Sequence, residues 1–179
     1  MSSEKSVKAD ILLGAVLILM VIVSRLTSHI WNFTILGGAA LFAGAYFSNK
    51  YLAALTIFLG LIISDSVLGF HNQMPAVYLS YAVILGLGIL LNQNAARFKI
   101  FSFSVLGGCL FFLITNFAVW YSGQMYSQNL DGLLICYQMA IPFFRSQITA
   151  DIISSIVLFE IAARLKLPAT LAQTVRFKL

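Results

Sequence analysis

The residues able to do chemistry in this chain are few, and each stands isolated in apolar sequence. Asp65 precedes His71 by six positions near the end of one apolar run, and Arg145 precedes Asp151 by six at the start of another. Such groups support acid–base chemistry only where they converge, and otherwise bind small molecules through charge and hydrogen bonds. No GxSxG, HExxH or clustered His/Asp metal motif accompanies them. Ligand binding is therefore the preferred interpretation, and no cofactor or metal is expected.

The composition decides where these residues lie. Of the 179 residues, 60% are hydrophobic and 9% are charged, and the mean hydropathy is +0.94. Soluble domains carry about 25% charged residues, so these charges are too few to cover a water-exposed surface. The net charge of +5 is spread singly or in pairs between apolar runs, which argues against nucleic acid as a partner. The sequence predicts one all-α, polytopic integral membrane domain over residues 1–179.

Six apolar runs are candidates for crossing a hydrocarbon core of about 30 Å, which takes roughly 17–25 residues in a helix. Residues 130–143 are also apolar but end near Pro142, so we expect a separate interfacial helix there. The predicted spans are about 9–26, 33–47, 51–68, 75–91, 100–121 and 144–165.

Six crossings place both termini on one side of the membrane. With this topology nine of the eleven basic residues share that side, which the positive-inside rule makes cytoplasmic. Only Arg25 and Arg145 fall elsewhere. No small-residue cleavage site follows the first apolar run, so we expect it to remain as a span. The nine are Lys5, Lys8, Lys50, Arg97, Lys99, Arg164, Lys166, Arg176 and Lys178.

Polar residues gather in the outer halves of the spans, whereas the inner halves are almost purely apolar. Glu160 is the main exception, and it precedes Arg164 by four residues, the spacing of a helical ion pair. Intramembrane polar groups usually face a bundle interior or a watery cavity. A bundle that is polar only in its outer half predicts a cup open to the outside, which suits binding better than conduction.

The first candidate group is Ser64-Asp65-Ser66 with the loop 69–75 that follows. The loop is short and rich in hydrogen-bonding groups, so it could arch over the cup. A capped helix end with solvated side chains is an equal alternative. The ligand-contact candidates of this group are Asp65, Phe70, His71 and Tyr78.

Asn32 and Thr34 form the second group, where a loop enters a short helix. A ligand contact and a simple helix N-cap are equally compatible with this position. Small residues at Ala39, Ala40, Ala43 and Gly44 repeat four apart, which favours close packing of this helix in the bundle.

The third group joins the fifth and sixth predicted spans. Asp151 lies about two turns inside the membrane, where an ionisable residue is a functional candidate by default. Gln147 precedes it by four residues and could hydrogen-bond it, while Arg145 or Arg25 could neutralise it. A purely structural buried polar network is the alternative to an aromatic-lined ligand pocket. The candidates of this group are Asn116, Trp120, Tyr137, Arg145 and Asp151.

The chain resembles the substrate-binding S components of energy-coupling factor (ECF) vitamin transporters, and more narrowly an uncharacterised family of small bacterial membrane proteins related to them. The six-span plan and the sequence from Ala140 to Leu165 carry the first resemblance. The second is carried by residues 32–45, Ile63-Ser64-Asp65 with Gly69-Phe70-His71, Thr115 to Trp120, and Cys136-Tyr137 to Arg145.

The resemblance implies a monomeric binder in the bacterial cytoplasmic (inner) membrane. It would capture a small vitamin-like micronutrient or precursor beneath the first, third and fifth loops, for transport into the cell. The implied partners are the lipid bilayer, the small-molecule ligand, and an ECF-type coupling subunit with its ATPases. An accessory or scaffold subunit of a membrane complex is the alternative function, followed by an intramembrane enzyme.

Overall fold

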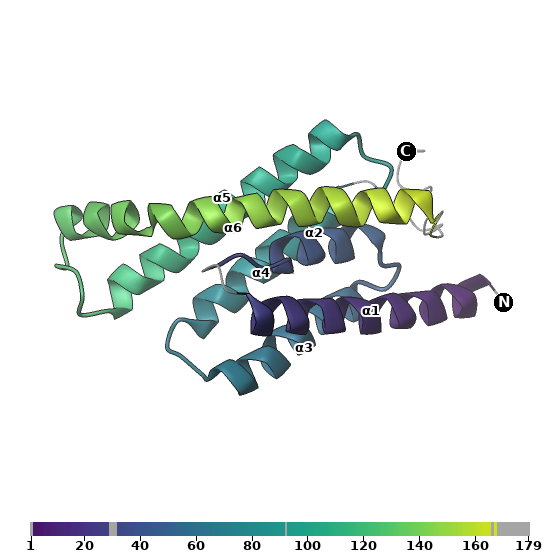
Figure 1. Ribbon diagram of the computed structural model, residues 1–179, viewed down its shortest axis with the longest axis horizontal. Helices are drawn as coiled ribbons and strands as arrows, with labels where there is room; N and C mark the ends of the chain where they lie inside the picture. The colour runs from purple at the N-terminus through teal and green to yellow at the C-terminus, as the bar shows by residue number, and fades with distance from the viewer. Residues whose placement is uncertain (1, 29–31, 92, 166, 168–179) are drawn as a thin grey trace.

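The computed structural model describes residues 2–28, 32–91, 93–165 and 167, which form helices and no β-strand, so the predicted all-α class is confirmed. Figure 1 shows the helices stacked side by side along the long axis of the molecule. They are α1 (Ser2–Thr27), α2 (Leu36–Tyr46), α3 (Lys50–Leu68), α4 (Met74–Leu90), α5 (Arg97–Ser122) and α6 (Leu130–Arg164).

Four helices are long and apolar enough to cross a membrane, and two apolar helices are shorter. The four are Val7–Thr27 of α1, all of α3, all of α5 and all of α6. The shorter two are α2, with 11 residues, and α4, with 17. At about 1.5 Å per residue, α2 rises roughly 16 Å, about half of a hydrocarbon core. The membrane-protein prediction thus rests on four helices, and the expected span at 33–47 is shorter than predicted.

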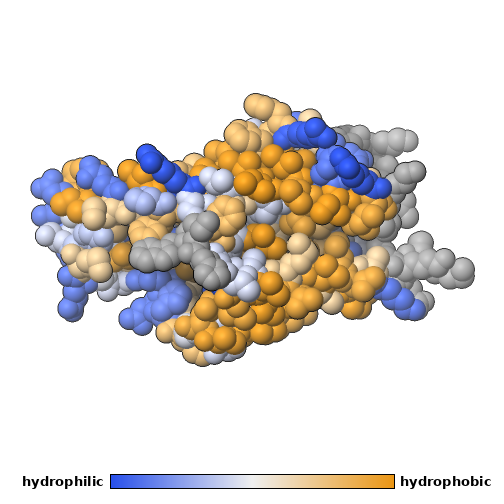
Figure 2. Space-filling model, viewed as in Figure 1, coloured by the Kyte–Doolittle hydropathy of each residue, from blue (hydrophilic) through white to orange (hydrophobic). Residues whose placement is uncertain are grey.

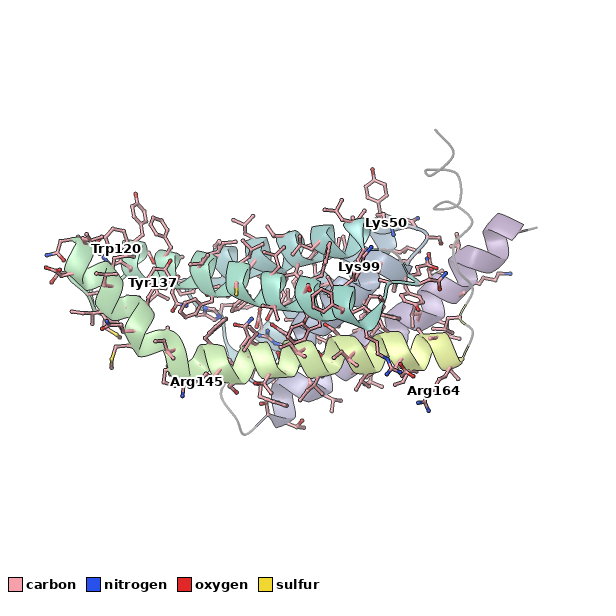
Figure 3. All side chains as sticks on the ribbon, turned by 90° about the horizontal axis from the view of Figure 1, so that it is seen from above. Lys50, Lys99, Trp120, Tyr137, Arg145 and Arg164 are labelled. Atoms are coloured by element: carbon pink, nitrogen blue, oxygen red, sulfur yellow. The ribbon has the colours of Figure 1, made fainter. Side chains whose placement is uncertain are left out.

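The separate interfacial helix predicted at 130–143 is wrong, because α6 is one helix of 35 residues with Pro142 inside it. Proline removes one backbone hydrogen bond and crowds the preceding turn, which bends a helix without necessarily ending it. Figure 3 shows this bend close to the labelled Arg145. Pro142, which predicted a boundary between two helices, therefore marks a bend within one helix, α6.

Basic residues gather at one end of the molecule. Lys50, Lys99 and Arg164 lie at one end of the long axis, and Trp120 and Tyr137 lie at the other (Figure 3). The start of α1 and the end of α6 lie at the basic end (Figure 1). Three residues of the predicted basic group thus lie towards the same end as the start of α1. Three members of that grouping lie outside the described residues, namely Lys166, Arg176 and Lys178.

α2 is the centre of the bundle, and every one of its residues is buried. It packs chiefly against α4 and α6, and also touches α1, α3 and α5. A Cβ atom on Gly44 would lie 2.9 Å from the Cα of Gly88, so the α2 and α4 backbones are nearly in contact. A Cβ atom on Gly38 would likewise clash with Ser154 and Ser155 of α6, so α2 and α6 are also in close contact. The close packing predicted from the small residues of this helix is confirmed.

Both ends of α2 are closed by ionisable side chains from other elements. Ile35 at the N-cap position has no side-chain hydrogen bond to offer, and the carboxylate of Asp151 accepts from the backbone N–H of Gly37 instead. At the other end, Lys50 Nζ donates to the backbone oxygens of Gly44, at 2.8 Å, and Phe47, at 2.6 Å. A negative group at the start of a helix and a positive one at its end suit the helix dipole.

The outer surface of the bundle is apolar over much of its length. Figure 2 shows hydrophobic residues covering the middle of the visible face, with hydrophilic residues concentrated towards both ends. On α1, Leu12 is 70% exposed and Leu19 is 63% exposed. Contiguous exposed apolar surface of this kind is costly in water and ordinary in lipid.

Replacing Gly88 by Ala should destabilise the protein by about 1–3 kcal/mol, because the added methyl group would clash with the backbone of α2. Gly86→Ala, two positions away on the same helix, is the control, since nothing lies within 4 Å of its added Cβ. Thermal unfolding of the purified protein in detergent compares them. Equal melting temperatures for the two variants would contradict the close α2–α4 contact.

Candidate ligand-binding cavity

A cavity of about 420 Å³ lies at the end of the bundle opposite Lys50 and Lys99. This volume is within the range of about 300–1,000 Å³ that is typical of small-molecule sites. Its walls come from α1, α3, α4, α5, α6 and the connections that follow α1 and α3. The polar lining residues are Arg25, Ser28, Asn32, Thr34, His71, Tyr81, Thr115, Asn116 and Gln147, and the apolar ones are Leu68, Val77, Phe111, Phe112, Val119, Ala140, Phe143 and Phe144.

A buried ion pair lies behind one wall of the cavity, and of its two residues only Arg25 lines the cavity. The guanidinium of Arg25, on α1, pairs with Asp65, on α3, and the hydroxyl of Tyr78, on α4, donates to the other carboxylate oxygen at 2.8 Å. The Asp65 side chain is 3% exposed and that of Arg25 is 14% exposed. Buried charges require such partners, because desolvation of an unpaired charge is very costly. The side chains of Arg25, Asp65 and Tyr78 therefore join α1, α3 and α4 beside the cavity.

Arg25 has donor capacity left after this pairing. A guanidinium has five N–H groups, and the contact with Asp65 uses Nη2. Nε is buried and has no hydrogen-bond partner among the described residues. The other N–H groups of the guanidinium are therefore the donors that Arg25, as a lining residue, can offer to the cavity.

A second polar network lies behind the cavity. Gln147 Nε2 donates to Asp151 Oδ2 at 2.8 Å, which confirms the predicted i, i+4 hydrogen bond. Asp151 is 3% exposed and does not itself line the cavity. Neither arginine expected to neutralise it does so, because Arg25 pairs with Asp65 and Arg145 is exposed. The start of α2 supplies the compensating positive potential through Gly37.

Aromatic rings form the wall contributed by α5 and α6. Phe112 lies 4.6 Å from Phe144 between ring centroids, and Tyr81 lies 5.1 Å from Phe111. Such rings offer flat apolar surface to a ligand, with geometry fixed by their mutual packing. The hydroxyl of Thr34 donates to that of Tyr81, which ties the α1–α2 connection to α4.

The residues predicted for the site separate into three groups. Four line the cavity, namely Asn32, Thr34, His71 and Asn116. Three hold lining residues in place without lining the cavity themselves, namely Asp65, Tyr78 and Asp151. The remaining four lie away from it, namely Phe70, Trp120, Tyr137 and Arg145.

Those four residues have other surroundings. Phe70 is 72% exposed. Trp120 Nε1 donates to the backbone oxygen of Ser127 at 2.9 Å, and Tyr137 Oη donates to that of Leu113 at 2.8 Å. Both bonds stabilise the hairpin between α5 and α6. Tyr137 also packs on Phe112, at 5.4 Å between ring centroids, and thereby supports the aromatic wall.

Four of the lining residues that were not among the candidates are phenylalanines. Phe111, Phe112, Phe143 and Phe144 fall in continuous apolar sequence, where a cavity-facing ring and a lipid-facing ring give the same pattern. Phe117, for comparison, belongs to the same run on α5 and is 48% exposed. Residue type alone therefore contains no signal that separates the two.

The two acidic residues beside the cavity have partners other than those that acid–base chemistry would require. Asp65 contacts Arg25 and Tyr78, and Asp151 contacts Gln147 and Gly37, whereas no contact of either with His71 or Arg145 is found among the described residues. Within the described part of the chain, no group of three or more His, Cys, Asp or Glu residues could hold a metal ion. The site consists of positioned polar groups facing an aromatic wall.

Together these features define an all-helical protein of membrane type with a small-molecule-sized cavity at one end. The chain belongs to the family DUF6580, described as a family of unknown function, which matches residues 5–172. Comparisons with curated proteins and with solved structures give no match.

Replacing Arg25 by Leu should destabilise the protein by about 3–5 kcal/mol, because Asp65 would be left as a buried, unpaired charge. The double variant R25L/D65L removes both charges and should recover most of this loss. Arg145→Leu is the control for removing an exposed arginine and should leave the melting temperature nearly unchanged. A double variant no more stable than R25L would contradict the assigned pairing.

Proposed function

We propose that this protein is a transporter-type binding protein that captures a small, vitamin-like micronutrient or precursor at the outer side of the bacterial cytoplasmic membrane for uptake. The observation that carries the proposal is the cavity of about 420 Å³, which combines polar residues with an aromatic wall. Small-molecule sites are generally built from few placed polar groups on a largely apolar lining.

The location of the cavity supports capture from outside. Its lining residues include Arg25 and Leu68, at the ends of α1 and α3 that lie away from Lys50, Lys99 and Arg164. Basic residues favour the cytoplasmic side of membrane proteins, so the mouth of the cavity faces outward in this proposal. In this proposal the four long helices cross the membrane and the shorter helices α2 and α4 lie among them; every residue of α2 is buried.

The proposed partners follow from the resemblance to S components. They are the bilayer, the ligand, and an ECF-type coupling subunit with ATPases that supply the energy for uptake. Affinity purification of the tagged protein from its native membrane tests the last of these. Recovery of a stoichiometric ATPase pair supports coupling, and recovery of the protein without partners indicates that it works alone.

Ligand binding should be detectable as thermal stabilisation of the purified protein in detergent. A compound present at 100 times its Kd stabilises the folded state by about 2.7 kcal/mol. We expect at least one member of a panel of vitamins, vitamin precursors and nucleobase-like compounds to raise the melting temperature in a saturable manner.

A matched pair of variants tests whether such a compound occupies the cavity. Thr115 lines it and Thr149 is exposed, and each hydroxyl donates to the carbonyl four residues earlier, at 2.8 and 2.7 Å. Thr115→Phe should fill the cavity and abolish stabilisation, whereas Thr149→Phe should preserve it. Stabilisation that survives in both variants places the ligand elsewhere, and no stabilisation by any compound in the panel counts against the function.

A further inference from the structure

The hydrogen bonds around the cavity fix which polar atoms remain for a ligand. Gln147 Nε2 faces the Asp151 carboxylate, and Asn116 Nδ2 faces the backbone oxygen of Phe112, both at 2.8 Å. A carbonyl oxygen only accepts hydrogen bonds, and Asp151 already accepts from the backbone of Gly37. Both amides are therefore held with nitrogen towards the protein, and their oxygens have no partner among the described residues.

The opposite wall offers a donor. Arg25 lines the cavity with a side chain that is 14% exposed, while Asp65 holds the guanidinium in place. The cavity thus presents one donor from α1 and two acceptor oxygens from α5 and α6. A complementary ligand carries an acceptor on one side and an N–H donor on the other.

The charges around the cavity favour an uncharged ligand. Arg25 is the only lysine or arginine among the described lining residues, and Asp65 already neutralises it. A second carboxylate, that of Asp151, lies one hydrogen bond behind Gln147. An anionic ligand would therefore approach the carboxyl groups of Asp65 and Asp151 with no unpaired lysine or arginine among the described lining residues to receive it, which is unfavourable in a poorly solvated site.

The aromatic wall favours a flat ligand. Phe112 and Phe144 lie 4.6 Å apart between ring centroids with their planes tilted by 39°, and Phe111 packs against Tyr81. Planar rings stack on such surfaces in offset or edge-on geometry.

We propose that the cavity binds an uncharged, flat heterocycle with ring amide groups. Its carbonyl oxygen accepts a hydrogen bond from the guanidinium of Arg25, and its ring N–H donates to the side-chain oxygen of Asn116 or Gln147. This inference rests on the proposed function, because it names the ligand class of that same cavity.

Three ring systems of increasing size serve as probes, namely uracil, pteridinedione and alloxazine. Each is titrated against the full-length protein in detergent by thermal shift, beside its N,N′-dimethyl derivative and its ring carboxylate. Methylation removes the N–H donors, and the carboxylate adds a negative charge. In at least one ring system the parent compound should bind about 10-fold more tightly than both derivatives, which corresponds to about 1.4 kcal/mol.

Arg25→Lys tests the donor directly, because lysine keeps the positive charge beside Asp65 but has no planar guanidinium whose remaining N–H groups could reach a ligand. It should weaken binding of the parent compound about 10-fold. Arg145→Lys is the matched control, since Arg145 is exposed and away from the cavity, and its affinity should equal that of the wild type.

Equal or tighter binding of the carboxylate or dimethyl derivatives overturns the proposal, and so does an unchanged affinity in R25K. If no probe binds while another compound of the broad panel does, the ligand class is wrong and the proposed function stands. If nothing in either set binds, both proposals fail.

Discussion

The burial of α2 is the constraint on which the rest of the structure depends. A helix leaves four N–H and four C=O groups without intrahelical partners at its ends, and α2 meets no solvent along its length. Asp151 accepts a hydrogen bond from the backbone of the first turn of α2. Lys50 donates to the backbone of its last turn, and Gln93 Nε2 lies 3.4 Å from the backbone oxygen of Tyr46 there. Two of the few ionisable residues in the chain are thus committed to closing one short helix.

The same constraint creates the cavity. With 11 residues, α2 rises only about 16 Å, so it fills the middle and the basic end of the bundle and leaves the other end open. No residue of α2 lines the cavity, whereas Asn32 and Thr34, just before it, do. Asp151, in closing the N-terminus of α2, also orients Gln147 at the cavity wall. Helix closure and ligand presentation are therefore parts of one hydrogen-bond network.

Hydropathy and residue spacing predicted those features of the structure that depend on residues close together in the sequence. The helical class follows from hydropathy, and the i, i+4 pairs Gln147–Asp151 and Glu160–Arg164 form as their spacing requires, at 2.8 and 3.2 Å. Long-range partners followed no such rule. Arg25 pairs with Asp65 across 40 residues, and Arg97 on α5 joins Glu160 at 3.0 Å, because the folded bundle brings their helices together. Hydropathy also could not separate cavity-facing phenylalanines from lipid-facing ones.

Pro142 shows how one residue can mislead a sequence prediction and still shape the site. Its missing N–H suggested a boundary between two helices, but α6 continues and bends instead. The lining residues of α6 lie on both sides of it, with Ala140 before and Phe143, Phe144 and Gln147 after. Before the bend, Tyr137 fastens the helix to Leu113 of α5. After the bend, the buried Ser155 of α6 donates a hydrogen bond to Ser104 of α5, at 3.2 Å between the hydroxyl oxygens. A helix held to one neighbour on both sides of a bend curves around the space between, and the cavity lies along that curve.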